Sequence, residues 1–266
     1  MNSLTALKVS AMVGKAMEYA SRAAEIQMKY YRSGHLDVET KFSESDIVTK
    51  ADRESEKVII DGIQADYPDH NILSEESGRL AQGSDWIWVI DPLDGTTNYT
   101  AGLPLFGISI GIRYKGETVG ACVYVPVTDE MFTAIRGVGA YLNGEEIHVR
   151  DNDDMARAVV STGFPVDKDT NPDNNLDNVT RVLPKVRGLR RLGAASVDLC
   201  YVAAGVLDAY WEMNLHEWDI CAGALIVELA GGIVHHFRND RCESIIASSP
   251  GVYGEMRRLI SGHSPE

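Results

Sequence analysis

An apolar run in this chain stops abruptly at two aspartates that lie three residues apart. Residues 89–99 are Val-Ile-Asp-Pro-Leu-Asp-Gly-Thr-Thr-Asn-Tyr, so Asp91 directly follows an apolar pair and Asp94 directly precedes a glycine. A strand over residues 86–90 would deliver both carboxylates to its end. Hard divalent cations such as Mg²⁺ prefer oxygen ligands, and the backbone N–H groups of a glycine turn that opens a helix can bind phosphate. The stretch therefore predicts a metal-assisted phosphate site.

The same residues could also form an ordinary β-turn, because Asp, Pro and Gly are common turn formers. Three further segments favour the functional interpretation: Asp46-Ile-Val-Thr-Lys-Ala-Asp52, Ser74-Glu-Glu-Ser77 and Glu212-Met-Asn-Leu-His-Glu-Trp-Asp-Ile-Cys-Ala-Gly223. Together with residues 89–99, and in this order, they resemble the inositol monophosphatase family. That family lies within the lithium-sensitive, magnesium-dependent phosphatases, which also include fructose-1,6-bisphosphatases and nucleotide phosphatases. The resemblance covers nearly the whole chain.

The resemblance implies a layered α/β/α/β/α sandwich with the active site between two halves. Helical periodicity over residues 4–31 and 49–66 is followed by short extended runs with hairpin turns at Lys115-Gly116 and Asn143-Gly144. These runs are residues 72–74, 86–90, 105–114, 118–125 and 131–135. Residues 1–150 are therefore expected to form an α+β half, with the metal-binding helices and an antiparallel meander.

Beyond about residue 149, expected strands and helices alternate, which indicates an α/β half over residues 151–266. The expected elements are 158–161, 174–186, 189–192, 195–204, 207–213, 219–230 and 233–237. The polar segment Asp151-Asn-Asp-Asp154 is the best candidate for the boundary. This second half would hold the substrate pocket and the last metal ligand.

Composition narrows the possible partners and location. A chain of 266 residues with 44% hydrophobic residues can bury a full core. The net charge of −14 disfavours direct nucleic-acid binding, since no basic surplus is left to neutralise phosphates. Four cysteines without Cys-x-x-Cys spacing indicate reduced thiols and hence the cytoplasm. Charged residues interrupt the first 31 residues, so neither a signal peptide nor a membrane span is expected.

The resemblance also implies a set of metal ligands. Asp91 would bridge two Mg²⁺ ions, with Glu75 and the Leu93 carbonyl on the first ion and Asp94 and Asp219 on the second. Two ions about 4 Å apart can clamp the attacking and leaving oxygens of an in-line displacement. Two to three Mg²⁺ ions are expected, with Li⁺ as an inhibitor.

Two of these acids have simpler alternatives. Glu75 could be a solvated loop acid, as neighbouring glutamates in loops usually are. Asp219 could serve as the N-cap of the helix expected over residues 219–230. A cap and a metal ligand are compatible roles, so both interpretations stay open for Asp219.

Asp52 has two possible roles. With Thr49 it matches a capping box, whereas the family resemblance pairs it with Thr96 to polarise the attacking water, general-base help typically worth about 10² to 10⁴ in rate. We favour the catalytic role for Asp52 and Thr96. The resemblance further implies that the N–H groups of Gly95 and Thr96 cradle the phosphate, and that Lys41 is the lysine of a loop near the metals.

The expected substrate-binding residues are Glu212, Gly193, Ala194 and Ala195. Glu212 matches the family acid that accepts a hydrogen bond from an inositol hydroxyl, and the other three match the segment that lines the sugar pocket. The hypothesis is a cytoplasmic enzyme that hydrolyses a small phosphomonoester, inositol monophosphate, with Mg²⁺. The family resemblance implies a homodimer. Histidinol phosphate, fructose 1,6-bisphosphate or another small phosphomonoester are alternatives. An interaction protein associated with the transcription machinery is an alternative of a different class.

Overall fold

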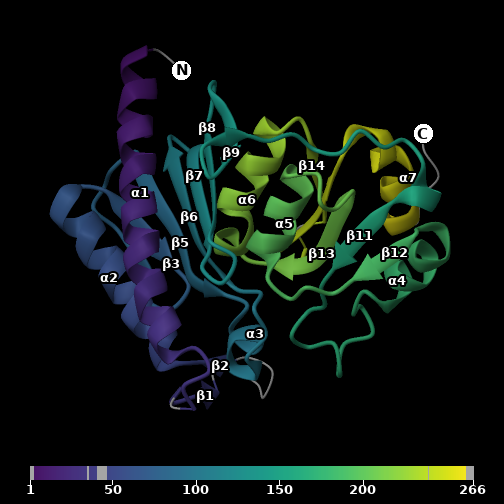
Figure 1. Ribbon diagram of the computed structural model, residues 1–266, viewed down its shortest axis with the longest axis horizontal. Coiled ribbons are helices and arrows are strands. Elements are labelled where there is room, and N and C mark those ends of the chain that lie inside the picture. Colours follow the sequence, from purple (N-terminus) through teal and green to yellow (C-terminus); the bar gives the residue numbers. More distant parts are fainter. Residues whose placement is uncertain (1–2, 35, 41–46, 239, 262–266) are drawn as a thin grey trace.

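Two β-sheets, with helices between them and on their outer faces, organise the chain (Figure 1). The computed structural model describes residues 3–34, 36–40, 47–238 and 240–261. The layers follow the order α/β/α/β/α, and this confirms the fold that the sequence predicted. Among the described residues, no helix is long and apolar enough to cross a membrane.

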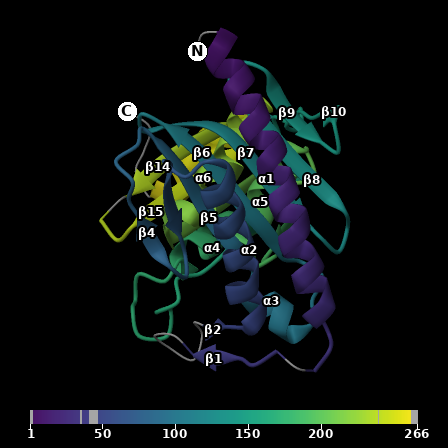
Figure 2. The same cartoon turned by 90° about the vertical axis from the view of Figure 1, so that its left-hand side faces the viewer.

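Helices α1 (Ser3–Tyr30) and α2 (Lys50–Asp66) form the first layer and cover one face of the larger sheet (Figure 2). Buried residues of α1 recur at helical spacing, because an amphipathic helix turns one apolar stripe to the core. They are Val9, Met12, Val13, Ala16, Tyr19, Ala20, Ala23, Ala24 and Gln27. Both helices match their predicted ranges to within one residue.

The larger sheet has eight strands in the order β10-β9-β8-β7-β6-β5-β3-β4. Their bounds are β3 Asn71–Ser74, β4 Gly78–Leu80, β5 Trp86–Asp94, β6 Gly107–Tyr114, β7 Glu117–Val125, β8 Glu130–Ile135, β9 Gly139–Leu142 and β10 Glu145–Glu146. All neighbours are antiparallel except β3 and β5, which are parallel. The prediction of a purely antiparallel meander was therefore wrong at this edge. The short strand β4, which the sequence did not reveal, carries the chain away from β3 before it returns along β5.

A small pair of strands, β1 (Glu39–Thr40) and β2 (Ile47–Val48), lies at the start of α2, where the sequence predicted a loop. Residues 41–46 lie outside the described residues, and so does the prediction for Lys41. Helix α3 (Thr96–Ala101) follows β5 directly.

The second sheet has five strands in the order β12-β11-β13-β15-β14. The elements of this half are η1 Met155–Arg157, β11 Val159–Thr162, α4 Leu176–Val182, η2 Leu183–Lys185, β12 Gly188–Arg190, α5 Ala195–Ala203, β13 Ala209–Leu215, α6 Glu217–Leu229, β14 Ile233–Arg238, β15 Glu243–Ser248 and α7 Pro250–Ser261. Strand β11 is parallel to β12 and β13, whereas β15 is antiparallel to both of its neighbours. The first sheet ends before residue 151 and the second begins after residue 154, and we propose the boundary of the two halves there.

Helices α5 and α6 form the middle layer, between the two sheets. Most residues of α6 are buried, as expected of a helix covered on several sides. A Cβ atom at Gly223 would lie 2.7 Å from the Leu199 side chain, so this glycine lets α5 and α6 pack closely. The Ala-Gly pair of the fourth sequence segment therefore serves the packing of this layer. Helices α4 and α7 cover the outer face of the second sheet.

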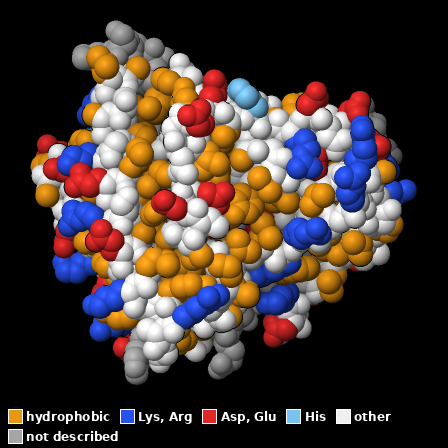
Figure 3. All heavy atoms as spheres, viewed as in Figure 1, with side chains coloured by type: hydrophobic (Ala, Val, Ile, Leu, Met, Phe, Trp, Pro, Cys, Tyr) orange, Lys and Arg blue, Asp and Glu red, His pale blue; other side chains and the backbone are white. Residues whose placement is uncertain are grey.

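In the space-filling view, hydrophobic side chains gather over the middle of the face that Figure 1 shows, and charged side chains lie more towards both ends (Figure 3). Apolar patches on a surface are typical of protein contacts. This distribution agrees with the homodimer that the family resemblance implies, which stays a prediction.

Candidate active site

Strand β5 carries both aspartates of the first sequence segment at its end. It continues through Asp94, four residues beyond the predicted end, and its pairing with β6 shifts between Asp91 and Asp94. Pro92 has no N–H to donate to the ladder, and prolines in strands are therefore found at such irregularities. Both carboxylates are buried, and Asp91 accepts a hydrogen bond from the Leu93 N–H at 3.0 Å.

Asp94 is held by the first turn of α5, which belongs to the other half of the chain. Its Oδ2 accepts hydrogen bonds from the Ser196 N–H at 2.7 Å and from the Ser196 Oγ at 2.5 Å, and its Oδ1 accepts one from the Ala195 N–H at 3.2 Å. Negative charge is stabilised at a helix N-terminus. This contact joins the end of β5 to the middle layer.

Glu75 follows β3, and the parallel pairing of β3 with β5 brings it to the same edge as the aspartates. The Glu75 N–H donates to the Ile90 carbonyl at 3.2 Å. The buried carboxylate of Glu56 on α2 holds the turn in place, since it accepts hydrogen bonds from Ser74 Oγ at 2.5 Å, Ser77 N–H at 2.9 Å and Ser77 Oγ at 2.5 Å. Sequence reasoning missed Glu56, because a single acid on a helix gives no motif.

Asp219 lies in the first turn of α6. The cap residue of this helix is His216, whose N–H donates to Asp219 Oδ2 at 2.7 Å. The alternative in which Asp219 itself is the N-cap was therefore wrong by three residues. The ring of His216 stacks on Trp218 with centroids 4.7 Å apart, and this contact fixes the backbone that leads to Asp219.

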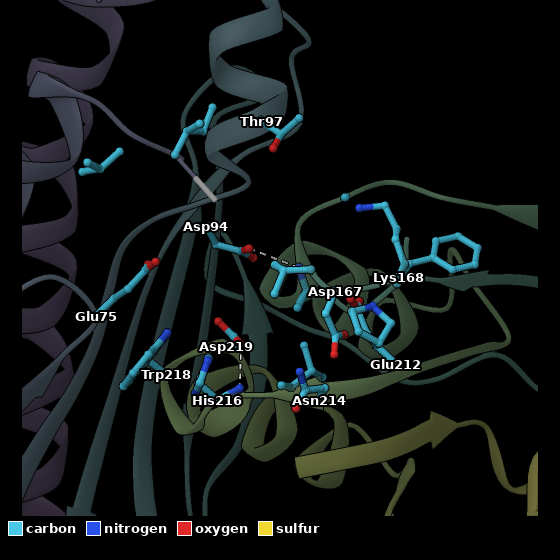
Figure 4. A pocket seen from close by; sticks show the side chains of 18 of the residues that line it. Glu75, Asp94, Thr97, Asp167, Lys168, Glu212, Asn214, His216, Trp218 and Asp219 are labelled. Atoms are coloured by element: carbon cyan, nitrogen blue, oxygen red, sulfur yellow. Dashed lines mark hydrogen bonds between the residues drawn. The ribbon is translucent and has the colours of Figure 1, made fainter. Parts of the chain in front are cut away.

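Four acids gather at this place, and the pKa of three of them is raised. Burial raises the pKa of Asp91 well above its usual range, and Glu75, Asp94 and Asp219 raise it further. The pKa of Asp94 rises to about 6, mainly through burial, although the Ser196 donors lower it. Burial and the charge of Asp94 raise the pKa of Asp219. Figure 4 shows Glu75, Asp94 and Asp219 pointing into a common space.

The donor set fits a hard divalent cation. All four side chains are carboxylates, and Mg²⁺ prefers such oxygen ligands. A positive charge would also offset the mutual repulsion of these carboxylates. No three His, Cys, Asp or Glu side chains in the described part of the chain already lie close enough to hold an ion. Asp94 and Asp219 accept hydrogen bonds from neutral donors of the chain, and their role as metal ligands stays a prediction.

Asp52 makes both of the contacts between which the sequence left a choice. Its Oδ2 accepts hydrogen bonds from the Thr49 N–H at 2.9 Å and the Thr49 Oγ1 at 2.5 Å, so the capping box is present. Thr96 Oγ1 lies 3.0 Å from Asp52 Oδ1 and also 3.0 Å from the Leu93 carbonyl oxygen. A hydroxyl has one hydrogen, so Thr96 can donate to only one of them at a time. Burial raises the pKa of Asp52, while Thr49 and Thr96 lower it.

The turn between β5 and α3 depends on a glycine. Gly95 has φ +89°, and a Cβ atom there would lie 3.0 Å from the Ala194 side chain and 3.1 Å from the Leu105 carbonyl oxygen. Asn98 on α3 donates to the carbonyl oxygens of Leu105 and Leu192, each at 2.7 Å. These contacts bring the expected phosphate cradle at Gly95 and Thr96 against Gly193 and Ala194.

A cleft of about 1460 Å³ lies in front of the acids. Its lining includes Glu75, Asp94, Asp219, Gly193, Ala195 and Glu212, so residues from distant parts of the chain share one cavity. Ala194 is buried behind this wall. The loop after β11 contributes Phe164 to Thr170, which sequence reasoning missed because they match no motif (Figure 4).

Glu212 reaches the cleft from β13. Its Oε2 accepts a hydrogen bond from the Tyr210 hydroxyl at 2.6 Å. A Cβ atom at position 163 would lie 2.0 Å from the same oxygen, so only glycine fits beside this carboxylate. The pKa of Glu212 rises to about 7, mainly through burial, against the lowering influence of Tyr210 and Arg191.

Comparison with known proteins identifies the family. A model of the inositol monophosphatase family matches residues 8–264. The chain belongs to this family. It is 41% identical over 255 residues to a protein named Nus factor SuhB from Pasteurella multocida, a match that covers 94% of this chain and 95% of the relative. A protein of the same name from Pseudomonas aeruginosa is 42% identical over 229 residues, with 83% and 84% covered.

Solved structures of inositol monophosphatase relatives share the fold. The extragenic suppressor protein suhB from Bartonella henselae superposes with a TM-score of 0.89 at 35% identity, covering 96% of this chain and 100% of that structure. An inositol monophosphatase from Anabaena gives a TM-score of 0.85 at 32% identity, with 97% and 98% covered. The chain therefore belongs to a phosphatase family, several of whose relatives carry the name of a Nus factor.

Six of the residues expected of an inositol monophosphatase line one cleft, and Asp52 and Asp91 are buried. The acids Glu75, Asp91, Asp94 and Asp219 and the pair Asp52–Thr96 lie around the ends of β3 and β5 and the first turns of α3 and α6. Sequence reasoning missed Ser196, although it directly follows the expected pocket segment and is the main partner of Asp94.

Proposed function

We propose that this protein hydrolyses a small phosphomonoester, inositol monophosphate, in the cytoplasm with the help of magnesium ions. The proposal is carried by one observation: two kinds of acid share one cleft. Glu75, Asp94 and Asp219 line it at one end with Asp91 buried beside them, and Glu212 lines it elsewhere. The first set suits cations and phosphate, whereas Glu212 suits a hydroxyl-bearing leaving group.

In this proposal the four acids and the Leu93 carbonyl would hold two to three ions, with Asp91 as the bridging ligand that the family resemblance implies. When bound, magnesium supplies the positive charge that neutralises the phosphate, promotes ionisation of water and stabilises the leaving oxygen. Li⁺ is expected to inhibit, as the family resemblance implies.

Asp52 and Thr96 provide a proton path that uses only groups of this chain. Thr96 can donate its hydroxyl hydrogen to Asp52 Oδ1, and its oxygen then accepts a hydrogen bond from the attacking water. Thr49 binds the other oxygen of Asp52 and so fixes the direction in which Oδ1 points. The capping box therefore supports the catalytic role of Asp52.

Glu212 orients the leaving group in this account. Tyr210 occupies one carboxylate oxygen, and the remaining acceptor capacity is available to a hydroxyl in the cleft. A polyol such as inositol offers several hydroxyls besides its phosphate. A simple aryl phosphate offers none.

A phosphate-release screen tests the proposal directly. Purified protein is incubated with inositol monophosphate, histidinol phosphate, fructose 1,6-bisphosphate and p-nitrophenyl phosphate, in Mg²⁺ and in excess chelator. We expect the highest kcat/KM for inositol monophosphate and no turnover in chelator. A clear preference for another member of the panel would replace the substrate, and full activity in chelator would contradict the role of the metal.

The names of the relatives support a second candidate, association with the transcription machinery. Relatives about 40% identical over nearly the whole chain are named Nus factor SuhB. Binding to purified RNA polymerase, measured by biolayer interferometry for the wild type and for Asp91→Asn, tests this candidate. Equal binding by both proteins would show an interaction independent of catalysis, and lack of binding would count against the candidate.

A further inference from the structure

The loop between β11 and α4, residues 163–175, is closed at its neck, and its first part borders the cleft. Asn175 is buried, and its Nδ2 donates to the Gly163 carbonyl at 2.6 Å and to Thr162 Oγ1 at 2.9 Å. Trp211 donates to Asn175 Oδ1 at 2.8 Å. Loops whose ends meet in this way pack as compact units and are frequently functional. We call residues 163–175 the cleft loop.

The first part of the cleft loop forms a wall of the proposed substrate cavity. Residues 164–170 all line the cleft together with Glu212, and Figure 4 labels Asp167 and Lys168 among them. Gly163, at the neck, packs against the Glu212 carboxylate. The position of this loop therefore affects the same space as the acid that would hold a polyol.

Two arginines, the last residue of β14 and one in the connection to β15, hold the cleft loop from outside. Arg241 donates from Nη2 to both carboxylate oxygens of Asp167, at 2.8 and 2.7 Å, and from Nη1 to the Asp173 carbonyl at 2.8 Å. Arg238 makes a two-pronged contact with Asp173, from Nη1 and Nη2 at 3.0 and 2.7 Å. We call Asp167, Asp173, Arg238 and Arg241 the arginine clamp.

The arginine clamp differs from the ordinary surface ion pairs of this chain. The side chains of Arg241 and Arg238 are 24% and 34% exposed, and the contacts form a connected set rather than one pair. Isolated exposed pairs contribute little, whereas two-pronged arginine contacts and networks contribute more. The pKa values of Asp167 and Asp173 are lowered by their hydrogen-bond partners and the arginine charges, as expected of carboxylates that stay ionised here.

We propose that Arg238 and Arg241 are positioning residues for the substrate. They fix the cleft loop as a rigid wall next to Glu212 and thereby set the affinity for a hydroxyl-bearing leaving group. They touch neither the acids of the metal site nor the reacting atoms, so they act through the loop alone. The expected effect on KM rests on the proposed function. The expected effect on the rigidity of the cleft loop rests on the structure alone.

The double variant Arg238→Gln/Arg241→Gln tests both parts. Hydrogen exchange measured by mass spectrometry should become faster in peptides covering residues 164–174, because charged anchors of the loop are lost. The KM for inositol monophosphate should rise roughly 3- to 10-fold, while kcat stays within about twofold. The KM for p-nitrophenyl phosphate should stay unchanged. Arg258→Gln, which removes an exposed pair with Glu255 on α7, is the matched control and should change none of these quantities.

A charge-conserving variant and a change of ionic strength distinguish a positioning role of the arginines from a general loss of structure. Arg238→Lys/Arg241→Lys keeps both charges but not the planar guanidinium groups, and its KM for inositol monophosphate should lie between those of the wild type and the double Gln variant. Raising the ionic strength should increase the ratio of the KM for inositol monophosphate to that for p-nitrophenyl phosphate in the wild type and change this ratio little in the double Gln variant, since salt screens partly exposed ion pairs.

Two results would overturn the inference: unchanged exchange in residues 164–174, or faster exchange with equal KM changes for both substrates. If the wild type releases phosphate from neither substrate, the proposed function fails separately. The arginine clamp is then judged by hydrogen exchange alone, in which unchanged protection of the loop would contradict it.

Discussion

At the scale of single residues, the central feature is that most acids of the site are oriented by neutral donors of the chain. Asp94 binds the Ala195 and Ser196 N–H groups, Asp219 binds the His216 N–H, and Asp52 binds Thr49. Neutral donors fix the orientation of a carboxylate without cancelling its negative charge. The acids can therefore act on a cation or a proton and still keep a defined geometry.

The pair Asp52 and Thr96 is expected to act on the attacking water. Asp52→Asn and Thr96→Ala should each lower kcat by about 10²- to 10⁴-fold with little change in KM. The double variant should lose much less than the product of the single losses, because both residues serve one proton path. Steady-state kinetics per folded molecule, with circular dichroism to count folded protein, checks this. Unaltered kcat with a large loss of stability would show that Asp52 serves only the capping box.

Glu212 should govern the choice between polyol and aryl substrates. Glu212→Gln is expected to lower kcat/KM for inositol monophosphate by roughly 10- to 150-fold, the effect of one charged hydrogen bond. The value for p-nitrophenyl phosphate should change little. An equal loss for both substrates would remove Glu212 from leaving-group recognition.

The raised pKa of Glu212 gives that prediction a pH dependence. With a pKa of about 7 the carboxylate is ionised above pH 7 and protonated below it. The wild-type ratio of kcat/KM for inositol monophosphate to that for p-nitrophenyl phosphate should therefore fall as the pH drops through 7. In Glu212→Gln the ratio should be flat across this range.

At the scale of elements, the sequence predicted most helices and strands but not how two of them meet. The parallel pairing of β3 with β5 could not be foreseen, because the intervening β4 is three residues long. Strand β15 was missed because Ile245, Ile246 and Ala247 are all buried, so no alternation of polar and apolar residues marks it. Helix α7 was missed because it begins at Pro250-Gly251. The motif residues were predictable, whereas Glu56, Ser196 and the arginine clamp depend on contacts between distant segments.

The contact between α2 and the turn after β3 is expected to position Glu75. Glu56→Gln leaves the Ser74 and Ser77 donors without a charged acceptor and should destabilise the protein by about 1–3 kcal/mol. It should also raise the Mg²⁺ concentration needed for half-maximal activity. Urea unfolding and a Mg²⁺ titration check both effects. Asp61→Asn, which removes an exposed ion pair on the same helix, is the control. An unchanged Mg²⁺ requirement would show that the turn is held by other contacts.

At the scale of the whole molecule, the site exists only when both halves fold together. Asp94 from the first sheet is bound by α5 from the middle layer, and Glu212 comes from the second sheet. This arrangement buries several like charges at one place, which costs free energy of folding. Stability should therefore depend on pH and on magnesium.

Burial raises the pKa of Asp94 from 3.8 to about 6, and it raises that of Asp91 well above its usual range. An acid whose pKa is raised on folding favours the folded state below its unfolded pKa, and this stabilisation is lost as the pH rises through the folded pKa. In chelator, Asp91→Asn should therefore be more stable than the wild type at pH 7, by about 1 kcal/mol or roughly 2–4 °C in Tm. The difference should shrink towards pH 4. Mg²⁺ should raise the Tm of the wild type and leave that of Asp91→Asn nearly unchanged, as scanning calorimetry can show.

The central claim is that Asp91 serves catalysis through bound metal rather than the stability of the fold. The most direct test is phosphate release from inositol monophosphate by Asp91→Asn and wild type at saturating Mg²⁺, with Tm measured on the same samples. We expect near-complete loss of turnover in a variant whose Tm is equal to or above that of the wild type in chelator. Wild-type turnover by Asp91→Asn would contradict the account.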